Sequence, residues 1–251
     1  MGATVQGFSR EPPCSHAPAA PRGTLNPSLL RPTMQPPPPI TRALLIACTV
    51  LLFAAQVPPL LLPIGQWLAL HPALSGFWPW QLVTFPFIHV NVLNWLFNMM
   101  MLYYFGAQLE EIWGNRRYIQ FLLACTLTAA AVYLLLSLLP ALLGWATGTA
   151  PLIDASAVGL GMLVAFGILF PHRRIQLFFV LNLTMLQAVW IFLGIDAFLT
   201  LGDLFNGTGA WLRDVAQFGG ALGGYLMILY WRWRPPSFKR KKPPTHIRRV
   251  H

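Results

Sequence analysis

Ser156 is the residue of this chain best suited to act as a nucleophile, but the residue expected to face it is an amide. Ser156 lies in Asp154-Ala155-Ser156-Ala157, where a long apolar segment begins. The apolar segment 215–231, which should supply a base, carries Gln217 near its start. A side-chain amide can orient a hydroxyl by hydrogen bonding, but it cannot take its proton at neutral pH. The two residues therefore predict a serine that is held in place without being activated.

A second polar group stands where another apolar segment begins, and it consists of His89, Asn91, Asn94 and Asn98. Asn94 and Asn98 are four residues apart, so on a helix they share one face. An amide can donate to a carbonyl oxygen without any proton transfer, which suits these side chains to bind a substrate-like oxygen. Hydrogen bonding between helices is the alternative, because asparagine often does this in membranes.

Small residues recur at helical spacing further along the same segment. Gly106, Glu110 and Gly114 are each four residues apart, which predicts a close helix crossing with one carboxylate on the same side. We expect a structural role for Glu110, which should accept hydrogen bonds from a neighbouring loop.

The last apolar segment repeats this pattern. Gln217 shares a helix face with Gly220 and Gly224, and small residues also follow Ser156. Because small residues let helices approach closely, we expect these two segments to touch. Ser156 and Gln217 should then lie at one depth, a few ångströms below the outer surface.

The composition indicates that these segments lie in a bilayer. Of the residues, 56% are hydrophobic and only 10% are charged. A helix needs roughly 20 apolar residues to cross the hydrocarbon. The sequence predicts an all-α, polytopic membrane protein with six transmembrane helices, of which the fourth and sixth are short: Thr41–Leu62, Val83–Leu109, Tyr118–Leu139, Ser156–Phe170, Ile175–Leu201 and Val215–Trp231.

The basic residues set the expected orientation of this bundle. With six spans and a cytoplasmic N-terminus, 16 of the 17 Lys and Arg residues fall in the inner segments, and only Arg213 falls outside. This distribution follows the positive-inside rule, so both termini of a multi-pass protein should be cytoplasmic, in the plasma or inner membrane if the protein is prokaryotic. The net charge of +10 is then a topology signal, and nucleic acid is not an expected partner.

The two ends of the chain differ from the membrane domain expected at residues 41–233. Residues 1–40 are rich in proline and lack apolar periodicity, so we expect a disordered tail, with Met34 as a possible alternative start. Residues 234–251 form a basic cytoplasmic tail that should bind anionic lipid. The three cysteines have no pairing or metal-ligand spacing, and we expect neither a metal nor a cofactor: Cys14, Cys48 and Cys125.

Several spaced motifs together resemble the rhomboid family of intramembrane serine proteases over about Thr41–Arg234. His89, Asn94 and Asn98 are similar to the family's His-x4-His-x3-Asn. Gly106, Glu110 and Gly114 resemble the family's Gly-x3-Glu-x3-Gly. Its Ala-His-x2-Gly-x3-Gly is similar to a motif with glutamine in place of histidine: Ala216, Gln217, Gly220 and Gly224. Trp80-Gln81 resembles the Trp-Arg of the family's first loop. The resemblance implies a six-helix rhomboid-like bundle.

The departures from the family fall on its chemistry. The resemblance implies that Ser156 occupies the nucleophile position and that Asn98 and Asn94 occupy positions that bind the oxyanion. Gln217 stands in place of the base histidine, and both glycines that flank the serine are replaced. Leu160 also replaces the aromatic residue on which the base usually stacks. The scaffold of the family is retained while the route for the proton is interrupted.

Two functions from different classes follow from these departures. We expect a catalytically inactive pseudoprotease that binds transmembrane segments of client proteins. The alternative is an active serine-type intramembrane endopeptidase that uses a substitute base, with Asp214, Asp154 and His89 as the titratable candidates. A transport function would need a polar path, for which the sequence offers little beyond Asp196. Asp196 itself is expected in a helix–helix hydrogen bond or in lateral contact with a substrate.

Overall fold

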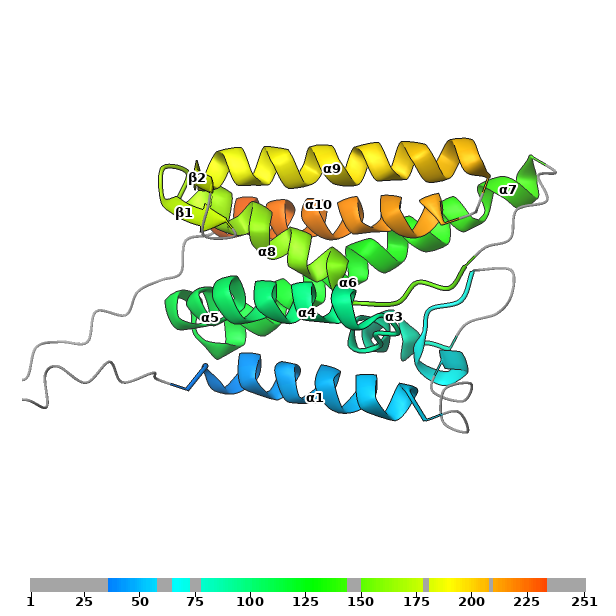
Figure 1. Ribbon diagram of the computed structural model, residues 1–251, viewed down its shortest axis with the longest axis horizontal. Helices are drawn as coiled ribbons and strands as arrows, with labels where there is room; N and C mark the ends of the chain where they lie inside the picture. The colour runs from blue at the N-terminus through cyan, green and yellow to red at the C-terminus, as the bar shows by residue number, and fades with distance from the viewer. Residues whose placement is uncertain are drawn as a thin grey trace, which may run out of the picture. The chain divides into compact units, whose positions relative to one another are not determined.

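The computed structural model describes residues 36–57, 65–72, 78–143, 150–177, 181–207 and 210–233. Most of the predicted tail at residues 1–40 (1–35), the predicted tail at 234–251 and Cys14 lie outside these ranges, so their predicted properties stay predictions. The N-terminal tail was predicted too long, because Pro39 and Ile40 already belong to α1. The described part is mostly helical, and its elements in chain order are α1 (Pro39–Ala55), α3 (Gln81–Thr84), η3 (Phe85–Phe87), α4 (Val92–Met101), η4 (Leu102–Gly106), α5 (Ala107–Trp113), α6 (Asn115–Ser137), α7 (Leu139–Leu142), α8 (Ser156–Leu169), β1 (Arg174–Leu177), β2 (Leu181–Thr184), α9 (Met185–Asn206) and α10 (Trp211–Trp233) (Figure 1).

Each of the six predicted spans contains a helix, but not all of these helices could cross a bilayer alone. By length and composition, two helices in the described ranges could do so, α6 and α9. A third would result if the bent pair Gln81–Phe87 and Val92–Trp113 were one broken span. α1 and α8 are apolar but shorter, with 17 and 14 residues. The count of six spans therefore stays a prediction.

The second predicted span begins later than expected. The helix was predicted from Val83, but the chain bends by 101° between Phe87 and Val92. Pro86 in η3 cannot continue a regular helix, and Ile88 is extended. Asn91 then caps α4, because its side chain accepts hydrogen bonds from the amides of Leu93 and Asn94 at 2.8 and 3.3 Å.

The fifth predicted span also begins too early, and the all-α prediction is wrong at this point. Strands β1 and β2 form an antiparallel pair, with Arg174 opposite Thr184 and Ile175 opposite Leu183. An apolar run does not by itself distinguish a strand from a helix. The sequence did contain the correct start signal, since Thr184 and Gln187 form a capping box that begins α9 at Met185.

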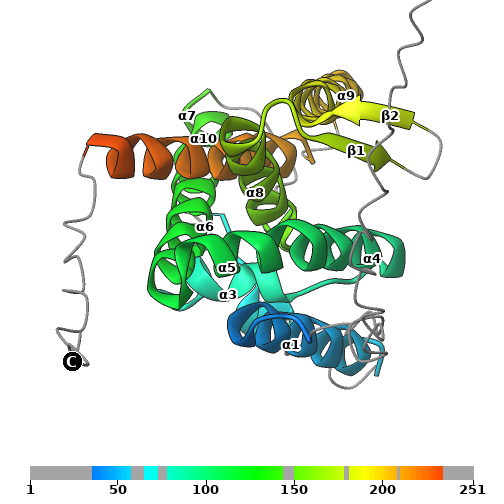
Figure 2. The ribbon, with the colours of Figure 1, turned by 90° about the vertical axis from the view of Figure 1, so that its left-hand side faces the viewer.

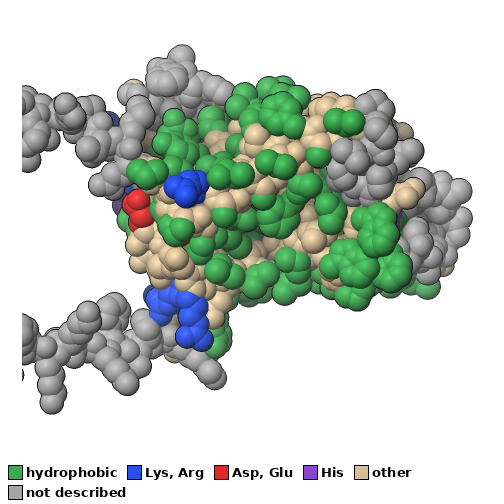
Figure 3. Space-filling view, turned by 90° about the horizontal axis from the view of Figure 1, so that it is seen from below, with side chains coloured by type: hydrophobic (Ala, Val, Ile, Leu, Met, Phe, Trp, Pro, Cys, Tyr) green, Lys and Arg blue, Asp and Glu red, His purple; other side chains and the backbone are tan. Residues whose placement is uncertain are grey.

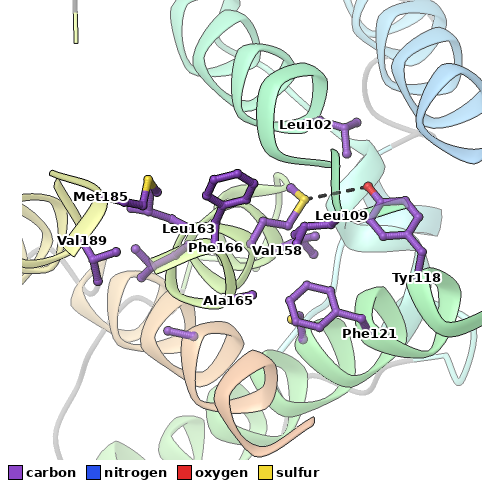
Figure 4. Packing of buried hydrophobic residues seen from close by; sticks show 14 of the residues in the cluster. Leu102, Leu109, Tyr118, Phe121, Val158, Leu163, Ala165, Phe166, Met185 and Val189 are labelled. Carbon is purple, nitrogen blue, oxygen red and sulfur yellow. Dashed lines mark hydrogen bonds between the residues drawn. The ribbon is translucent and has the colours of Figure 1, made fainter. Parts of the chain in front are cut away.

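α8 is the most enclosed helix in the described part of the chain. Figure 2 shows it between α10 on one side and α4 and α5 on the other, while α1 and α9 lie at opposite edges. Ten of its 14 residues are buried, which agrees with its uniformly apolar sequence. Figure 4 shows how Val158, Leu163 and Phe166 pack with side chains from the neighbouring helices, beside a contact between the Tyr118 hydroxyl and the Met162 sulfur.

Glycines make the contact between α8 and α10 possible, as their spacing predicted. A Cβ added to Gly220 would collide with the carbonyl oxygen of Ala157. A Cβ on Gly161 would lie 2.9 Å from the carbonyl oxygen of Gly220, and one on Gly224 would lie 3.0 Å from that of Gly161. We call these four residues, Ala157, Gly161, Gly220 and Gly224, the glycine interface.

Glu110 holds the start of α1. Its side chain is 2% exposed and accepts hydrogen bonds from the amides of Ile40 and Thr41, at 2.9 and 2.7 Å, and from the Thr41 hydroxyl at 2.7 Å. The first amides of a helix lack partners within it, so the carboxylate satisfies groups that would otherwise be buried without one. The donors belong to a helix start rather than to the loop that was expected.

The two glycines near Glu110 have different reasons to be glycine. A Cβ on Gly106 would lie 2.5 Å from the Tyr118 hydroxyl, which agrees with the expected close crossing. At Gly114 nothing lies within 4 Å of an added Cβ, but φ is +74° at the junction of α5 and α6. Gly114 is therefore required by the turn and not by helix packing.

The surface is apolar along the helices and basic at one end. Figure 3 shows hydrophobic side chains over much of one face, with Lys and Arg side chains gathered toward one end. Toward the opposite ends of these helices, the rings of Trp67, Trp78 and Trp80 stack with centroid distances of 6.1 and 4.9 Å. Tryptophan favours the membrane–water boundary, so this pattern agrees with an integral membrane protein.

Candidate functional site

Ser156 is the first residue of α8, and a strained turn places it there. Asp154 has φ of +74°, which is rare for any residue except glycine. Its amide donates to the carbonyl oxygen of Phe85 at 3.1 Å, and its Oδ1 accepts from the amide of Ser156 at 2.8 Å. Aspartate tolerates this conformation because its side chain can bond the backbone two residues later. The sequence did not reveal this role of Asp154, although the Asp-x-Ser pattern was a usable signal.

Two asparagines of α4 bond to the Ser156 hydroxyl. Nδ2 of Asn98 donates to Oγ of Ser156 at 3.2 Å and to Oδ1 of Asn94 at 2.9 Å. Nδ2 of Asn94 lies 3.5 Å from the same Ser156 oxygen. Asn98 is 7% exposed, so its amide is fixed by these contacts rather than by solvent. The structure thus brings together three residues that the sequence singled out.

A π-helical turn separates this site from the anchor at Glu110. Leu102–Gly106 form η4, which continues α4 into α5. Such a turn contains an extra residue, so it rotates the faces of the helix on either side of it. Asn94 and Asn98 therefore face α8, while Glu110, further along the same helix, faces the start of α1.

A cavity of about 170 Å³ lies beside Ser156 among α4, α8, α9 and α10. It includes two of the sequence-predicted site residues besides Ser156, namely Asn98 and Gln217, and also Asp196. Gln217 and Ser156 therefore share one cavity, as their expected common depth requires. The remaining lining residues were not predicted as site residues: Phe97, Met101, Gly159, Leu160, Leu163 and Phe192.

Asp196 lies near the middle of α9, just inside the half of the helix that is further from Met185. The helix begins at Met185 rather than at residue 175, so Asp196 is twelfth among its 22 residues. Its carboxylate forms no hydrogen bond with the residues that the structure describes. The Thr200 hydroxyl donates to the backbone carbonyl of Asp196 at 2.7 Å, which leaves the side chain facing the cavity.

His89 lies in the segment between η3 and α4 and does not line the cavity beside Ser156. It is 1% exposed, its Nδ1 is 3.4 Å from the carbonyl oxygen of Phe87, and its Nε2 has no hydrogen-bond partner within the described ranges. His89 interacts electrostatically with Asp154 in the loop before α8. The sequence had assigned His89 to oxyanion binding, and its position offers no direct contact with Ser156 for that role.

Burial favours the neutral forms of His89 and Asp154. Desolvation lowers the pKa of His89 below its ordinary value, and the nearby Asp154 charge only partly opposes this effect. Desolvation likewise raises the pKa of Asp154, while hydrogen bonds from Ser156 act in the opposite direction. The higher pKa makes the ionised carboxylate of Asp154 a stronger base than an ordinary aspartate, but its Oδ1 already accepts a hydrogen bond from the amide of Ser156.

The third candidate base, Asp214, belongs to a different contact. Its carboxyl hydrogen-bonds to that of Asp203 across α9 and α10, and neither residue lines the cavity beside Ser156. Within the described ranges, no group of three His, Cys, Asp or Glu side chains is arranged to hold a metal ion. The arrangement around Ser156 therefore offers amide donors and an acidic group, which can bind a polar group but supply no nitrogen base.

An apolar cavity of about 220 Å³ adjoins the site on the other side of Asn98. It is lined mainly by aliphatic and aromatic side chains of α1, α4, α6 and α8, together with residues of η3. Asn98 contributes to the lining of both cavities. The amide that contacts Ser156 thus stands between a polar cavity and an apolar one.

Comparison with known families matches residues 40–233 to a family described as "Eukaryotic integral membrane protein (DUF1751)". The matched range covers the helices from α1 to α10 that the structure describes. No curated protein matches the chain.

Proposed function

Because the chain belongs to the eukaryotic integral membrane protein family DUF1751, we propose that it is a rhomboid-like protein that binds transmembrane segments without cleaving them. It crosses the membrane six times, with both termini in the cytoplasm. Client helices enter beside the cavity that Ser156 shares with α4, α9 and α10. In this role the protein retains or escorts other membrane proteins.

The single observation that carries this proposal is the hydrogen bonding of Ser156. Its hydroxyl oxygen accepts from the amides of Asn98 and Asn94, and the α10 side chain in the same cavity is Gln217. A positioned general base contributes about 10²- to 10⁴-fold to a rate, and loss of one member of a serine catalytic unit costs more. Amide donors still bind a carbonyl or a polar side chain in the absence of that base.

The depth of the cavity also supports helix binding. α8 has 14 residues and so measures about 20 Å, against about 30 Å for the hydrocarbon. Ser156, at its first residue, therefore lies inside the bilayer when the inner end of α8 reaches the inner boundary. A polar site at that depth meets transmembrane segments rather than soluble ligands.

The second candidate function is an active intramembrane serine protease with Asp154 as its base. One observation favours it, because the Asp154 carboxyl contacts both the amide and the hydroxyl of Ser156. Against it stand the engagement of that carboxyl with the Ser156 amide and the side-chain amide of Gln217 where α10 lines the same cavity. We prefer the binding function for these reasons.

A fluorophosphonate probe separates the two functions, because it reacts with activated serines. The purified protein should show no labelling above a Ser156→Ala control. Labelling that disappears in Ser156→Ala and also in Asp154→Asn would establish the protease with Asp154 as its base. In the same preparation, a reporter with one transmembrane helix should remain uncleaved.

Photo-crosslinking tests the binding half of the proposal. A photoreactive residue in place of Phe97, which lines the cavity, should crosslink to the single-span reporter in membranes. The matched control is Leu135 of α6, which is 68% exposed and does not line the cavity. Equal crosslinking at both positions would contradict a specific binding site.

The basic tail, residues 234–251, has its own place in the proposal. It binds anionic lipid at the cytoplasmic surface, at about 1 kcal/mol per basic residue near that surface. A peptide of this range should bind anionic vesicles but not neutral ones, and more weakly as salt rises. Binding that ignores the charge of the lipid would leave the tail with a topological role alone.

A further inference from the structure

The carboxylate of Asp196 is a polar group that the fold places at mid-membrane without an evident structural use. It is about 16 Å along α9 from Met185, close to the centre of the helix. None of the described residues hydrogen-bonds to the carboxylate, and the four residues of α9 that are buried lie elsewhere: Met185, Ala188, Val189 and Thr200. A charged group at this depth is unfavourable unless it is paired. Its position at the cavity lets a partner from outside the chain reach it.

Apolar side chains frame the approach to this carboxylate from the lipid. On α9, Ile195 and Leu199 flank Asp196 and are 51% and 57% exposed. On α4, Leu93 and Leu96 are 61% and 53% exposed, and Phe97 is both partly exposed and part of the cavity lining. Two helix faces with exposed aliphatic groups and a polar centre between them have the chemistry of a surface for an apolar helix with one polar side chain.

The sign of the charge around the cavity selects the side chain of that helix. Asp214 of α10 does not line the cavity but interacts electrostatically with Asp196, so the charge that acts on Asp196 from α10 is negative. The nearby cation is Arg213, whose charge acts on Asp214, Asp154 and Tyr133. The lining of the cavity itself contains one charged residue, Asp196, together with the amides of Asn98 and Gln217.

We infer that Asp196 determines client specificity by pairing with a basic side chain near the middle of a client's transmembrane helix. The inference rests on the proposed function, because it concerns the same cavity and the same kind of client. A lysine or arginine at mid-membrane is as unfavourable as an unpaired aspartate, so pairing satisfies both groups at once. Asn98 and Gln217 supply amide oxygens for the remaining donors of the basic group.

Binding of synthetic helices to the full-length protein in nanodiscs tests the inference. Two dye-labelled poly-Leu/Ala helices differ only at the central residue, Lys in one and Leu in the other, and resonance energy transfer to the protein reports binding. The Lys helix should bind about ten-fold more tightly. Asp196→Asn should reduce this preference to about one, and Asp196→Lys should reverse it in favour of a helix with a central Glu.

The controls distinguish failure of the inference from failure of the proposed function. Asp203→Asn removes a carboxylate of the same helix that does not line the cavity, and it should leave the preference intact. Equal binding of the Lys and Leu helices, or a preference that survives Asp196→Asn, would overturn the role of Asp196 while leaving helix binding in place. If neither helix binds the wild-type protein, the proposed function itself is wrong. The charge reversal keeps the test decisive where Asp196→Asn alters the fold.

Discussion

α8 and α9 are both apolar helices, but the chain encloses one and leaves most of the other uncovered. Ten of the 14 residues of α8 are buried, against four of the 22 residues of α9. The glycines show the same difference. A Cβ on Gly161 of α8 would meet atoms within 3 Å, whereas one on Gly194 or Gly202 of α9 would meet nothing within 4 Å. Two helices of similar hydrophobicity therefore have different roles. α8 forms part of the core, whereas α9 presents a surface to lipid or to a partner helix.

The two ends of α9 differ as well. At the end that begins with Met185, the capping box, the β1–β2 pair and contacts with α8 fix the helix, and Met185 and Ala188 are fully buried. Beyond Val189 the exposed side chains dominate, and Phe198 and Phe205 are 74% and 85% exposed. The cavity with Asp196 lies beside the part of α9 that has few contacts.

The sharpest test of this comparison replaces one glycine at the α8–α10 contact, and one glycine of α9, with leucine. Gly220→Leu should destabilise the fold by about 3 kcal/mol or more, because the side chain would collide with the backbone at Ala157. Gly194→Leu should leave stability unchanged or slightly raised, since it fills open space and improves helix propensity. Thermal unfolding in detergent measures both. Equal shifts in the two variants would remove the distinction between core and surface.

A second pair of variants locates the fixed end of α9. A Cβ on Gly167 would lie 2.6 Å from Cγ2 of Val189, where α8 contacts the first turns of α9. Gly167→Leu should cost about 1–3 kcal/mol, less than Gly220→Leu, because a side chain can move aside more easily than a backbone. Gly202→Leu, further along α9, should be close to neutral in the same unfolding experiment. A large loss of stability in Gly202→Leu would mean that α9 is packed against other residues around Gly202.

The start of α8 should respond to pH. Burial raises the pKa of Asp154, so the folded chain holds this proton more tightly than the unfolded chain. The resulting stabilisation is complete below the ordinary pKa of aspartate, about 3.9, and is lost as pH rises through the folded value. Relative to Asp154→Asn, the wild type should therefore lose stability as the pH rises above about 4. Parallel pH profiles of unfolding for the two proteins would contradict the raised pKa.

The smallest expected effect belongs to Ser156 itself. Ser156→Ala should change the free energy of unfolding by no more than about 1 kcal/mol, because Asn98 keeps its bond to Asn94 and its freed donor faces the cavity. Chemical denaturation of both proteins in the same micelles gives the difference. A loss as large as that of Gly220→Leu would place Ser156 among the packing residues of the glycine interface.

The sequence best predicted those features that follow from the spacing of residues along a helix. The spacing of Gly220 and Gly224 predicted the contact with the Ser156 helix, and the four-residue repeat of Asn94 and Asn98 predicted one shared face. Both depend on helical geometry alone. Which residues bond to Ser156 could not be read in this way, since it depends on how α4 and α8 cross. The shared cavity of Gln217 and Ser156 followed from the family resemblance together with their expected depth.

The errors arose where hydrophobicity alone defined an element. Residues near Val83 and Ile175 are apolar enough for a membrane helix, yet one stretch bends at Pro86 and the other forms a strand. The strained turn at Asp154 escaped notice because aspartate rarely adopts a positive φ. The mid-helix position of Asp196 followed only when the true start of α9 was known.

The glycine interface also sets an order for the biogenesis of the protein. α8 leaves the ribosome before α10, and the face of α8 at Ala157 and Gly161 has no cover until Gly220 and Gly224 have been made. At 14 residues, α8 is also shorter than the bilayer is thick, so it holds its place through neighbours more than through its own hydrophobic length. During synthesis the nascent chain therefore carries a bare helix face inside the membrane. A chain that ends before Trp211 would keep that face of α8 without the cover that α10 provides.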